Sequence, residues 1–333
     1  MEARKLQKTG GSTYTLSLPK KWVLASKLAA GDAVFVDELA DGTLALRPHP
    51  VASPSGRAKV LDAPSGEVRD HLLRKLIGAY ISGYNVIEIR FKPDDGPSVR
   101  RVARDFTRMV IGPEILEESR TSLMLQDLSN PAEMDAERTL RRMYMTARAM
   151  HEDALEVLRT RDEALAKDVE QRDEDVDRLY WMIAKQYSLA HLAGPTTAAD
   201  WRATGVHNYR LVAKLLERIA DHAERIASAV SGLKGDLDPR LLKDMKSASD
   251  AAVSILDDAF RALMGKDTDL ANAAVDRAAG LQKLVDALTH RVATRKGEEL
   301  LALGAIVDSI QRTGSYATDI AETAINHVLA QED

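Results

Sequence analysis

Hydrophobic and polar positions follow three different periodic patterns along this chain of 333 residues. Over residues 1–50 apolar and polar side chains alternate, which is typical of β-strands. The alternation is clearest over residues 13–18, and Asp41-Gly42 predicts a turn that joins strands at 34–39 and 43–46 into a hairpin. A β unit this short cannot bury its own core, so we expect it to dimerise.

Residues 47–57 are rich in proline, serine and glycine, which is typical of a linker. The pattern of apolar positions changes after this segment. Over residues 58–128 we expect a helix that follows Ser65 as its N-cap, a strand at 85–91, a helix ending near Gly112 and then extended chain. This helix–strand–helix–strand order predicts a small α/β domain. No phosphate-loop glycine pattern occurs in it, and we expect a spacer or packing module.

From residue 130 the apolar spacing is helical. The periodic stretches lie near 131–159, 162–192, 205–232, 239–265, 267–293 and 297–330. Asn130-Pro131 and Asp238-Pro239 each place a capping residue before a first-turn proline. Six long helices predict an all-α region of two three-helix bundles, residues 130–233 and 236–333.

The two predicted bundles share a weak sequence repeat. ERIADHAERIA (217–227) aligns with QRTGSYATDIA (311–321), and DEDVDRLYWMI (173–183) aligns with QKLVDALTHRV (282–292). The spacing between the matched helices is similar in both halves. The sequence therefore predicts a duplicated three-helix unit with pseudo-two-fold symmetry.

Composition narrows the class of protein. Hydrophobic residues make up 45% of the chain, yet no apolar run approaches the roughly 20 residues that a transmembrane helix needs, so we expect no direct membrane insertion. No apolar stretch follows the first cations, as a signal peptide would require. The absence of cysteine excludes disulfides, thiolate metal sites and cysteine catalysis. We therefore expect a cytoplasmic protein.

Positive charge is concentrated at the start of the chain. The net charge is -5, but residues 1–27 carry six Lys or Arg side chains against one acid, Glu2. Such a local positive field indicates an arm that binds a polyanion, although an ordinary solvated surface has the same composition. The candidate DNA contacts are Arg4, Lys5, Lys8, Ser12, Lys20 and Lys21, the cations neutralising phosphates and the hydroxyl donating to one.

Two pairs of acids are candidates for a metal site. Asp173 and Asp177 are spaced i, i+4, as are Glu217 and Asp221, which places each pair on one helix face about 6 Å apart. Hard cations take carboxylate oxygens and would relieve the repulsion within each pair. In a chain with 29% charged residues such pairs also occur on solvated faces.

Helical phase places these acids differently. Asp173 and Asp177 fall at the edge of an apolar stripe, whereas Glu217, Asp221 and Glu224 fall opposite the apolar face of their helix, which predicts an accessible surface. His222, beside Asp221, is either a further ligand or a partly buried helix histidine.

LERIADHAERIA (216–227) together with RDEDVDRLYWMI (172–183) resembles the signature of PhoU-type phosphate uptake regulators, over about residues 132–330. The resemblance implies an (E/D)xxxD pattern in each repeat that binds clustered metal ions. The opening segment GGSTYTLSLPKKW is similar to AbrB/SpoVT-type domains, which are swapped hairpins that dimerise and bind DNA. The combination resembles the archaeal type of PhoU-related regulator.

The second repeat departs from this pattern, because its matching positions are Gln282, Asp286, Gln311 and Ser315. We therefore expect one metal site, in the first repeat, with iron, zinc, magnesium or manganese as the ion. Its candidate ligands are Asp173, Asp177, Glu217, Asp221 and Glu224. A site shared between the repeats stays open, with Asp286 as the second repeat's only contribution.

Three functions are compatible with these features. The favoured one is a dimeric, DNA-binding regulator of phosphate uptake with a metal-binding sensor domain, whose partners are double-stranded DNA, a second copy, and a phosphate transporter subunit or a sensor kinase. The alternative is an adaptor that acts through protein contacts, with the hairpin serving only dimerisation. A metalloenzyme is disfavoured, because no nucleophile, oriented base or cofactor loop accompanies the acids.

Overall fold

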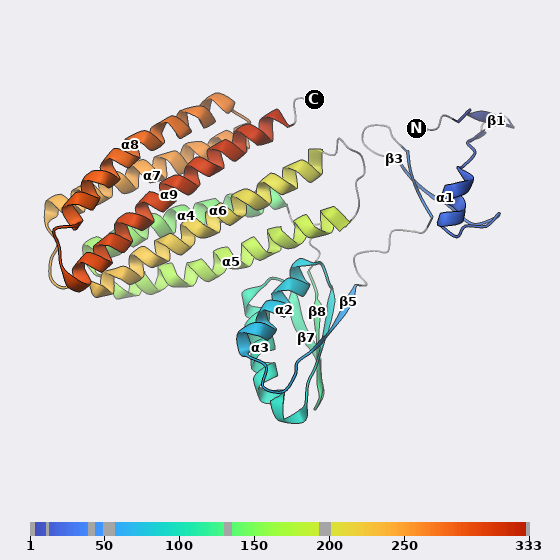
Figure 1. The fold of residues 1–333 in the computed structure, drawn as a ribbon, viewed down its shortest axis with the longest axis horizontal. Coiled ribbons are helices and arrows are strands. Elements are labelled where there is room, and N and C mark those ends of the chain that lie inside the picture. The colour runs from blue at the N-terminus through green and yellow to red at the C-terminus, as the bar shows by residue number, and fades with distance from the viewer. Residues whose placement is uncertain are drawn as a thin grey trace. The chain divides into compact units, whose positions relative to one another are not determined.

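The structure is a computed structural model, and it describes residues 4–10, 13–38, 44–48, 57–129, 135–192 and 201–330 (Figure 1). The chain forms two compact units. The first contains the described residues up to 48, called here the N-terminal arm. The second contains an α/β module, residues 57–129, and the helices that follow it. Within the described residues no helix combines the length and the apolar character needed to span a membrane.

The N-terminal arm consists of two small antiparallel pairs and one short helix. Its elements are β1 (Gln7–Thr9), β2 (Thr13–Thr15), α1 (Lys20–Ala25), β3 (Phe35–Glu38) and β4 (Leu44–Arg47). The predicted hairpin is confirmed by the pairing of Phe35 with Arg47, while its Asp41-Gly42 turn lies outside the described residues. The strand predicted over 13–18 ends at Thr15, and Pro19 is the N-cap of helix α1, which the alternation did not indicate.

The α/β module is a four-stranded sheet with both helices on one face (Figure 1). Its elements are β5 (Ala58–Asp62), α2 (Arg69–Ile81), β6 (Val86–Arg90), a 3-10 turn (Pro93–Asp95), α3 (Gly96–Met109), β7 (Pro113–Glu118) and β8 (Ser122–Asp127). The strand order is β5-β6-β8-β7; β5 and β6 are parallel and the other pairs antiparallel. Ser65 does not cap a helix, since α2 begins at Arg69 and the Ser65 hydroxyl donates to Asp95 at 3.0 Å.

The six predicted long helices are present. They are α4 (Ala136–Thr160), α5 (Glu163–Leu192), α6 (Trp201–Ala229), α7 (Pro239–Gly265), α8 (Thr268–Val292) and α9 (Gly297–Leu329), with a 3-10 turn at Val230–Gly232. Helices α4–α6 form the first bundle and α7–α9 the second. Helices α6 and α9 pack on each other, so that one continuous apolar core runs through both bundles.

The starts of two helices test the capping residues expected from the sequence. Asp238 accepts a hydrogen bond from the backbone N–H of Arg240, which confirms the cap before Pro239. The predicted start at Asn130-Pro131 lies outside the described residues, and α4 begins at Ala136 with Asp135 as its cap. A short acidic side chain can accept hydrogen bonds from the free backbone N–H groups of the first helical turn, so Asp135 can cap the start of α4.

The α/β module is attached to α5 through buried polar and apolar contacts. Lys185 of α5 forms an ion pair with Asp127 of β8, and both side chains are 1% exposed. The other oxygen of Asp127 accepts from Ser129 N–H at 2.9 Å and Ser129 Oγ at 2.6 Å. Trp181 packs against the core of the module. Helix α5 therefore belongs to the bundle and to the module at once.

Candidate metal centre

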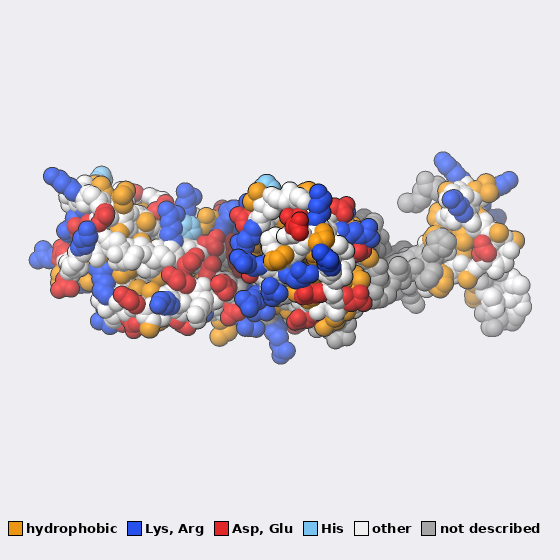
Figure 2. All heavy atoms as spheres, turned by 90° about the horizontal axis from the view of Figure 1, so that it is seen from below, with side chains coloured by type: hydrophobic (Ala, Val, Ile, Leu, Met, Phe, Trp, Pro, Cys, Tyr) orange, Lys and Arg blue, Asp and Glu red, His pale blue; other side chains and the backbone are white. Residues whose placement is uncertain are grey.

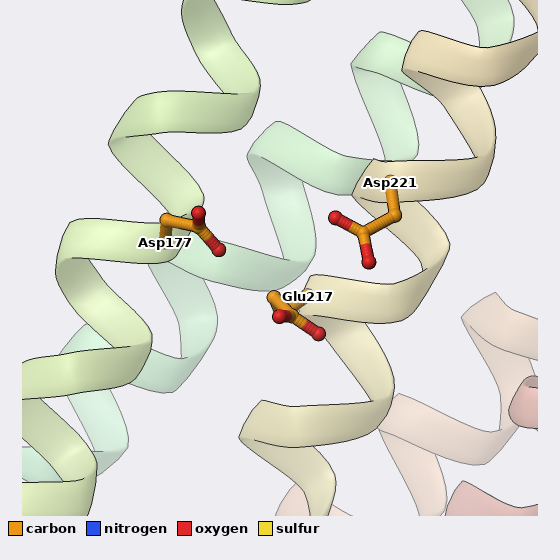
Figure 3. A group of neighbouring side chains, drawn as sticks. All are labelled: Asp177, Glu217 and Asp221. Carbon is orange, nitrogen blue, oxygen red and sulfur yellow. The ribbon is translucent and has the colours of Figure 1, made fainter. Parts of the chain in front are cut away.

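Three acids from two neighbouring helices converge in the first bundle. Asp177 of α5 extends toward Glu217 and Asp221, which lie one turn apart on α6 (Figure 3). Their carboxylate oxygens lie within 4.8 Å of one another. Within the described part of the chain, this is the one group of three potential ligands from His, Cys, Asp and Glu. We call Asp177, Glu217 and Asp221 the acid cluster.

The acid cluster is only partly neutralised by the protein itself. Glu217 is 7% exposed, and its Oε1 accepts from Lys214 Nζ at 2.5 Å. Its Oε2 is buried with no hydrogen-bond partner, as is Oδ1 of nearby Asp173. An unpaired buried carboxylate oxygen is costly, so both atoms offer an acceptor position to a cation or a proton.

Burial and mutual repulsion make these acids weak. Burial, followed by the charges of Asp221 and Asp177, raises the pKa of Asp173 to about 8. Burial, followed by the charge of Glu217, raises the pKa of Asp177 to about 7. The pKa values of Glu217, Asp221 and Glu224 are also raised, with burial as the largest cause. Without a cation Asp173 and Asp177 therefore hold protons near neutral pH, and a cation that binds there displaces them.

The residues present fit a hard cation. All three converging ligands are carboxylates, which suits magnesium, manganese or iron better than zinc, whose usual protein ligands include imidazole and thiolate. Asp173 and Glu224 lie outside the acid cluster, but the charge of Asp221 contributes to the raised pKa of both. The structure thus brings together three of the five acids proposed from the sequence and places the other two nearby.

One expectation from helical phase is wrong. Glu217 does not decorate an accessible surface, because α6 packs against α4, α5 and α9 and is covered on more than one side. Asp221 is exposed and Glu224 is half-buried. His222 is a partly buried helix histidine whose Nδ1 lies 3.0 Å from Ser309 Oγ of α9.

The matching positions of the second bundle hold hydrogen bonds instead of converging acids. Gln282 Nε2 donates to Asp286 Oδ1 at 2.8 Å, and Gln311 Nε2 donates to Gln282 Oε1 at 3.2 Å. Amide groups carry both donors and acceptors, so they join α8 to α9 without a cation.

The candidate DNA contacts lie in the N-terminal arm. Lys8 lies on β1, and Lys20 and Lys21 form the first turn of α1. The exposed cations of this set are Arg4, Lys5, Lys8, Lys20 and Lys21. Ser12 lies outside the described residues.

Sequence reasoning missed the surroundings of Asp177. A cavity of about 380 Å³ adjoins it, lined also by Arg69, Asp105, Arg108, Met109 and Glu174. The first four of these belong to the α/β module, and no local pattern indicates that they meet α5. Among these surroundings the contact between Lys214 and Glu217 could have been expected from the sequence, because the two residues are spaced i, i+3 on one helix.

The fold and the acid cluster define a class: a duplicated three-helix-bundle protein with a carboxylate site between two helices of one repeat. The PhoU domain model matches residues 140–230 and 245–324, about half of the chain, so the chain belongs to the PhoU family. Residues 7–53 match the model of the antidote-toxin recognition protein MazE, a bacterial antitoxin. The chain is thus a PhoU-type protein with an AbrB-like N-terminal domain.

Two curated relatives support this assignment. Over 125 residues the chain is 32% identical to the phosphate-specific transport system accessory protein PhoU homolog of Borreliella burgdorferi, covering 35% of the chain and 54% of that relative. The chain therefore spans about half the length of this relative. Over 193 residues it is 23% identical to the protein of the same name from Clostridium acetobutylicum, covering 56% of the chain and 87% of that relative.

Two solved structures share the fold. The crystal structure of PhoU from Pseudomonas aeruginosa matches with a TM-score of 0.54 and 22% identity, covering 59% of this chain and 96% of that one. The phosphate transport system regulatory protein PhoU from Streptococcus pneumoniae matches with a TM-score of 0.51 and 19% identity, covering 58% and 92%.

Proposed function

We propose that this protein regulates phosphate uptake by binding double-stranded DNA through its N-terminal arm and sensing through its PhoU-type bundles. The relatives' role in phosphate-specific transport supports the regulatory part. The observation that carries the DNA-binding part is the set of exposed cations on an arm of AbrB type. We assign DNA binding and dimerisation to residues 1–50, packing to residues 58–128, and sensing to residues 130–333.

The arm acts as a homodimer in this proposal. Its single chain leaves large apolar side chains exposed, namely Leu6, Tyr14, Leu16, Leu24, Phe35, Val36 and Leu44. Apolar surface of this kind is usually covered by a partner, and a second copy of a β unit too small for its own core is the simplest one. Dimerisation also doubles the number of cations offered to DNA.

DNA binding is tested by gel-shift titration of full-length protein at 50 and 200 mM salt. With six to ten phosphate contacts the affinity falls by about 10³-fold or more over this range. The paired substitution Lys20→Ala with Lys21→Ala weakens binding further. The matched control is Lys243→Ala with Lys283→Ala, two exposed lysines of the second bundle, and it leaves binding unchanged. Binding that ignores salt, or that survives the loss of Lys20 and Lys21, contradicts the assignment.

We assign Asp177, Glu217 and Asp221 as ligands of one hard metal ion, with Asp173 and Glu224 as additional carboxylates around it. The bound ion supplies positive charge between α5 and α6, where Glu217 and Asp173 each leave a buried oxygen without a partner. Elemental analysis of purified protein tests this, with one ion expected per chain. Asp221→Ala loses the ion, whereas the control Asp286→Ala retains it. Equal metal content in wild type and Asp221→Ala removes the site, and loss in Asp286→Ala indicates a site shared between repeats.

The proposed role is regulatory and not enzymatic, with a phosphate transporter subunit or a sensor kinase as the protein partner. The exposed apolar side chains of the arm equally favour the second candidate, an adaptor whose hairpin only dimerises. Deletion of residues 1–48 separates the two. In the regulator it abolishes both the dimer and DNA binding, whereas in the adaptor it abolishes the dimer of a protein that has no DNA affinity.

A further inference from the structure

An open cavity of about 380 Å³ lies where the α/β module meets the first bundle, and it adjoins the acid cluster. Helices α2 and α3 of the module both contact α5. Arg69 of α2 and Asp105, Arg108 and Met109 of α3 line one side, and α5 contributes Glu174 and Asp177. Asp177 is thus a member of the acid cluster and part of the cavity wall.

The two arginines differ in how they are held. Arg69 donates to Asp105 through Nε at 3.2 Å and Nη2 at 2.6 Å, which fixes its guanidinium against α3. Arg108, in the last turn of α3, has no ion pair or hydrogen bond from its side chain among the residues that the structure describes. An unpaired guanidinium retains all of its donors for a ligand.

The charges of the wall depend on the metal ion. Two guanidiniums and three carboxylates line the cavity, which leaves it one negative charge when all are ionised. With the neighbouring Glu217, Asp221 and Lys214 included the balance is two negative charges, and a divalent cation held by the acid cluster reduces it to zero. Figure 2 shows the same opposition on the surface: acidic side chains gather on the bundle beside the α/β module, whose adjoining edge carries Lys and Arg side chains.

We propose that this cavity binds inorganic phosphate, with Arg108 and Arg69 of the α/β module on one side and the metal ion at Asp177 on the other. Guanidinium groups match the oxygens of a tetrahedral oxyanion in bidentate geometry, and a metal ion accepts another oxygen. The volume lies within the range of small-ligand sites and leaves room for phosphate with bound water. This inference rests on the proposed metal site and gives the α/β module a part in sensing.

The contacts that attach the α/β module to α5 hold the walls of this cavity in place before a ligand binds. The buried pair Lys185–Asp127 joins β8 to α5 two turns beyond Asp177, and the Tyr80 ring lies 4.3 Å from Lys185 Nζ. Walls held in place before binding lose little conformational entropy when the ligand enters. Phosphate bound between them would link the module to the acid-bearing face of α5.

Equilibrium dialysis of radiolabelled orthophosphate tests the proposal on the full-length protein loaded with Mn²⁺. Phosphate binds to the loaded protein and not to protein stripped with EDTA. Loss of one charged donor in Arg108→Gln weakens phosphate binding by about tenfold or more. The matched control is Arg104→Gln, an exposed arginine one turn earlier on α3 that does not line the cavity, and it binds as wild type does.

Metal content, measured on the same samples, separates the two levels of the proposal. A protein that retains its metal while binding phosphate equally well in wild type and Arg108→Gln overturns the phosphate site and leaves the metal site standing. Equal phosphate binding with and without metal also overturns it. Absence of metal in the wild-type protein overturns the metal site itself, and the phosphate site with it.

Discussion

Nε2 of Gln311 donates to Oε1 of Gln282 at 3.2 Å, and these two residues occupy the positions in the second repeat that match Glu217 and Asp173 in the first. The two repeats thus solve the same contact between helices in different ways. In the second repeat, the side-chain amides of Gln311 and Gln282 are joined by a hydrogen bond. In the first, acids gather and leave buried oxygens without partners.

Restoring the acids of the second repeat is expected to create a second metal site. The triple substitution Gln282→Asp, Gln311→Glu and Ser315→Asp adds carboxylates beside Asp286 and removes the amide donors, so α8 and α9 then carry the ligand set proposed for α5 and α6. Elemental analysis should show the metal content rising from one to two ions per chain. An unchanged content in a variant with the wild-type circular dichroism spectrum would contradict this.

The metal-free protein should lose stability as pH rises from about 5 to 8. The pKa values of Asp173 and Asp177 are about 8 and 7 in the folded chain, against 3.8 for an unperturbed aspartate. The unfolded chain therefore releases these protons first, so the stability they confer is complete below pH 3.8 and disappears as pH passes the folded values. Melting temperatures in EDTA measure this. Asp173→Asn should flatten the profile and saturating Mn²⁺ should remove the decline; a parallel profile for Asp173→Asn would count against it.

Acid should destabilise the interface between the bundles through His151. This fully buried side chain of α4 lies 2.9 Å from Ser249 Oγ of α7 and 3.4 Å from Thr313 Oγ1 of α9. Burial, followed by the positive charge of His222, lowers its pKa from 6.5 to about 4. The stability that it confers is present above pH 6.5 and lost as pH falls toward 4.

Urea unfolding at pH 7 and pH 4.5 checks the histidine. His151→Gln keeps polar atoms in the cavity but does not titrate, so the variant should be the less stable protein at pH 7 and should lose less stability than wild type on acidification. An equal loss in both proteins would show that His151 does not titrate in this range.

Breaking the buried pair Lys185–Asp127 should loosen the α/β module. Removal of one partner leaves an unpaired buried charge, so Lys185→Ala or Asp127→Ala should each reduce the free energy of unfolding by about 3–5 kcal/mol. The exposed pair Lys246–Asp250 is the matched control, and Lys246→Ala should cost no more than about 0.5 kcal/mol. Both are measured by urea denaturation, and equal small losses would show that the module does not depend on this pair.

The sequence by itself determined the six long helices, their duplication and the chemistry that each helix carries. Apolar spacing predicted six long helices, and the i, i+4 acids on the segments that became α5 and α6 followed from helical periodicity. These features are local: they depend on residues within a few turns of one another. For the same reason Asp238-Pro239 marked a helix start correctly.

Only the tertiary structure decided which element covers which face. It buried Glu217, which helical phase had placed on an open surface, and brought Asp177 to α6. It also paired Lys185 with Asp127 across 58 residues and brought Arg108 and Asp177 to the wall of one open cavity. Periodicity reports that a helix has an apolar side but not which helix or sheet packs against it. Contacts between distant segments depend on the packing of the whole chain, and the acid cluster and its cavity both arise from such contacts.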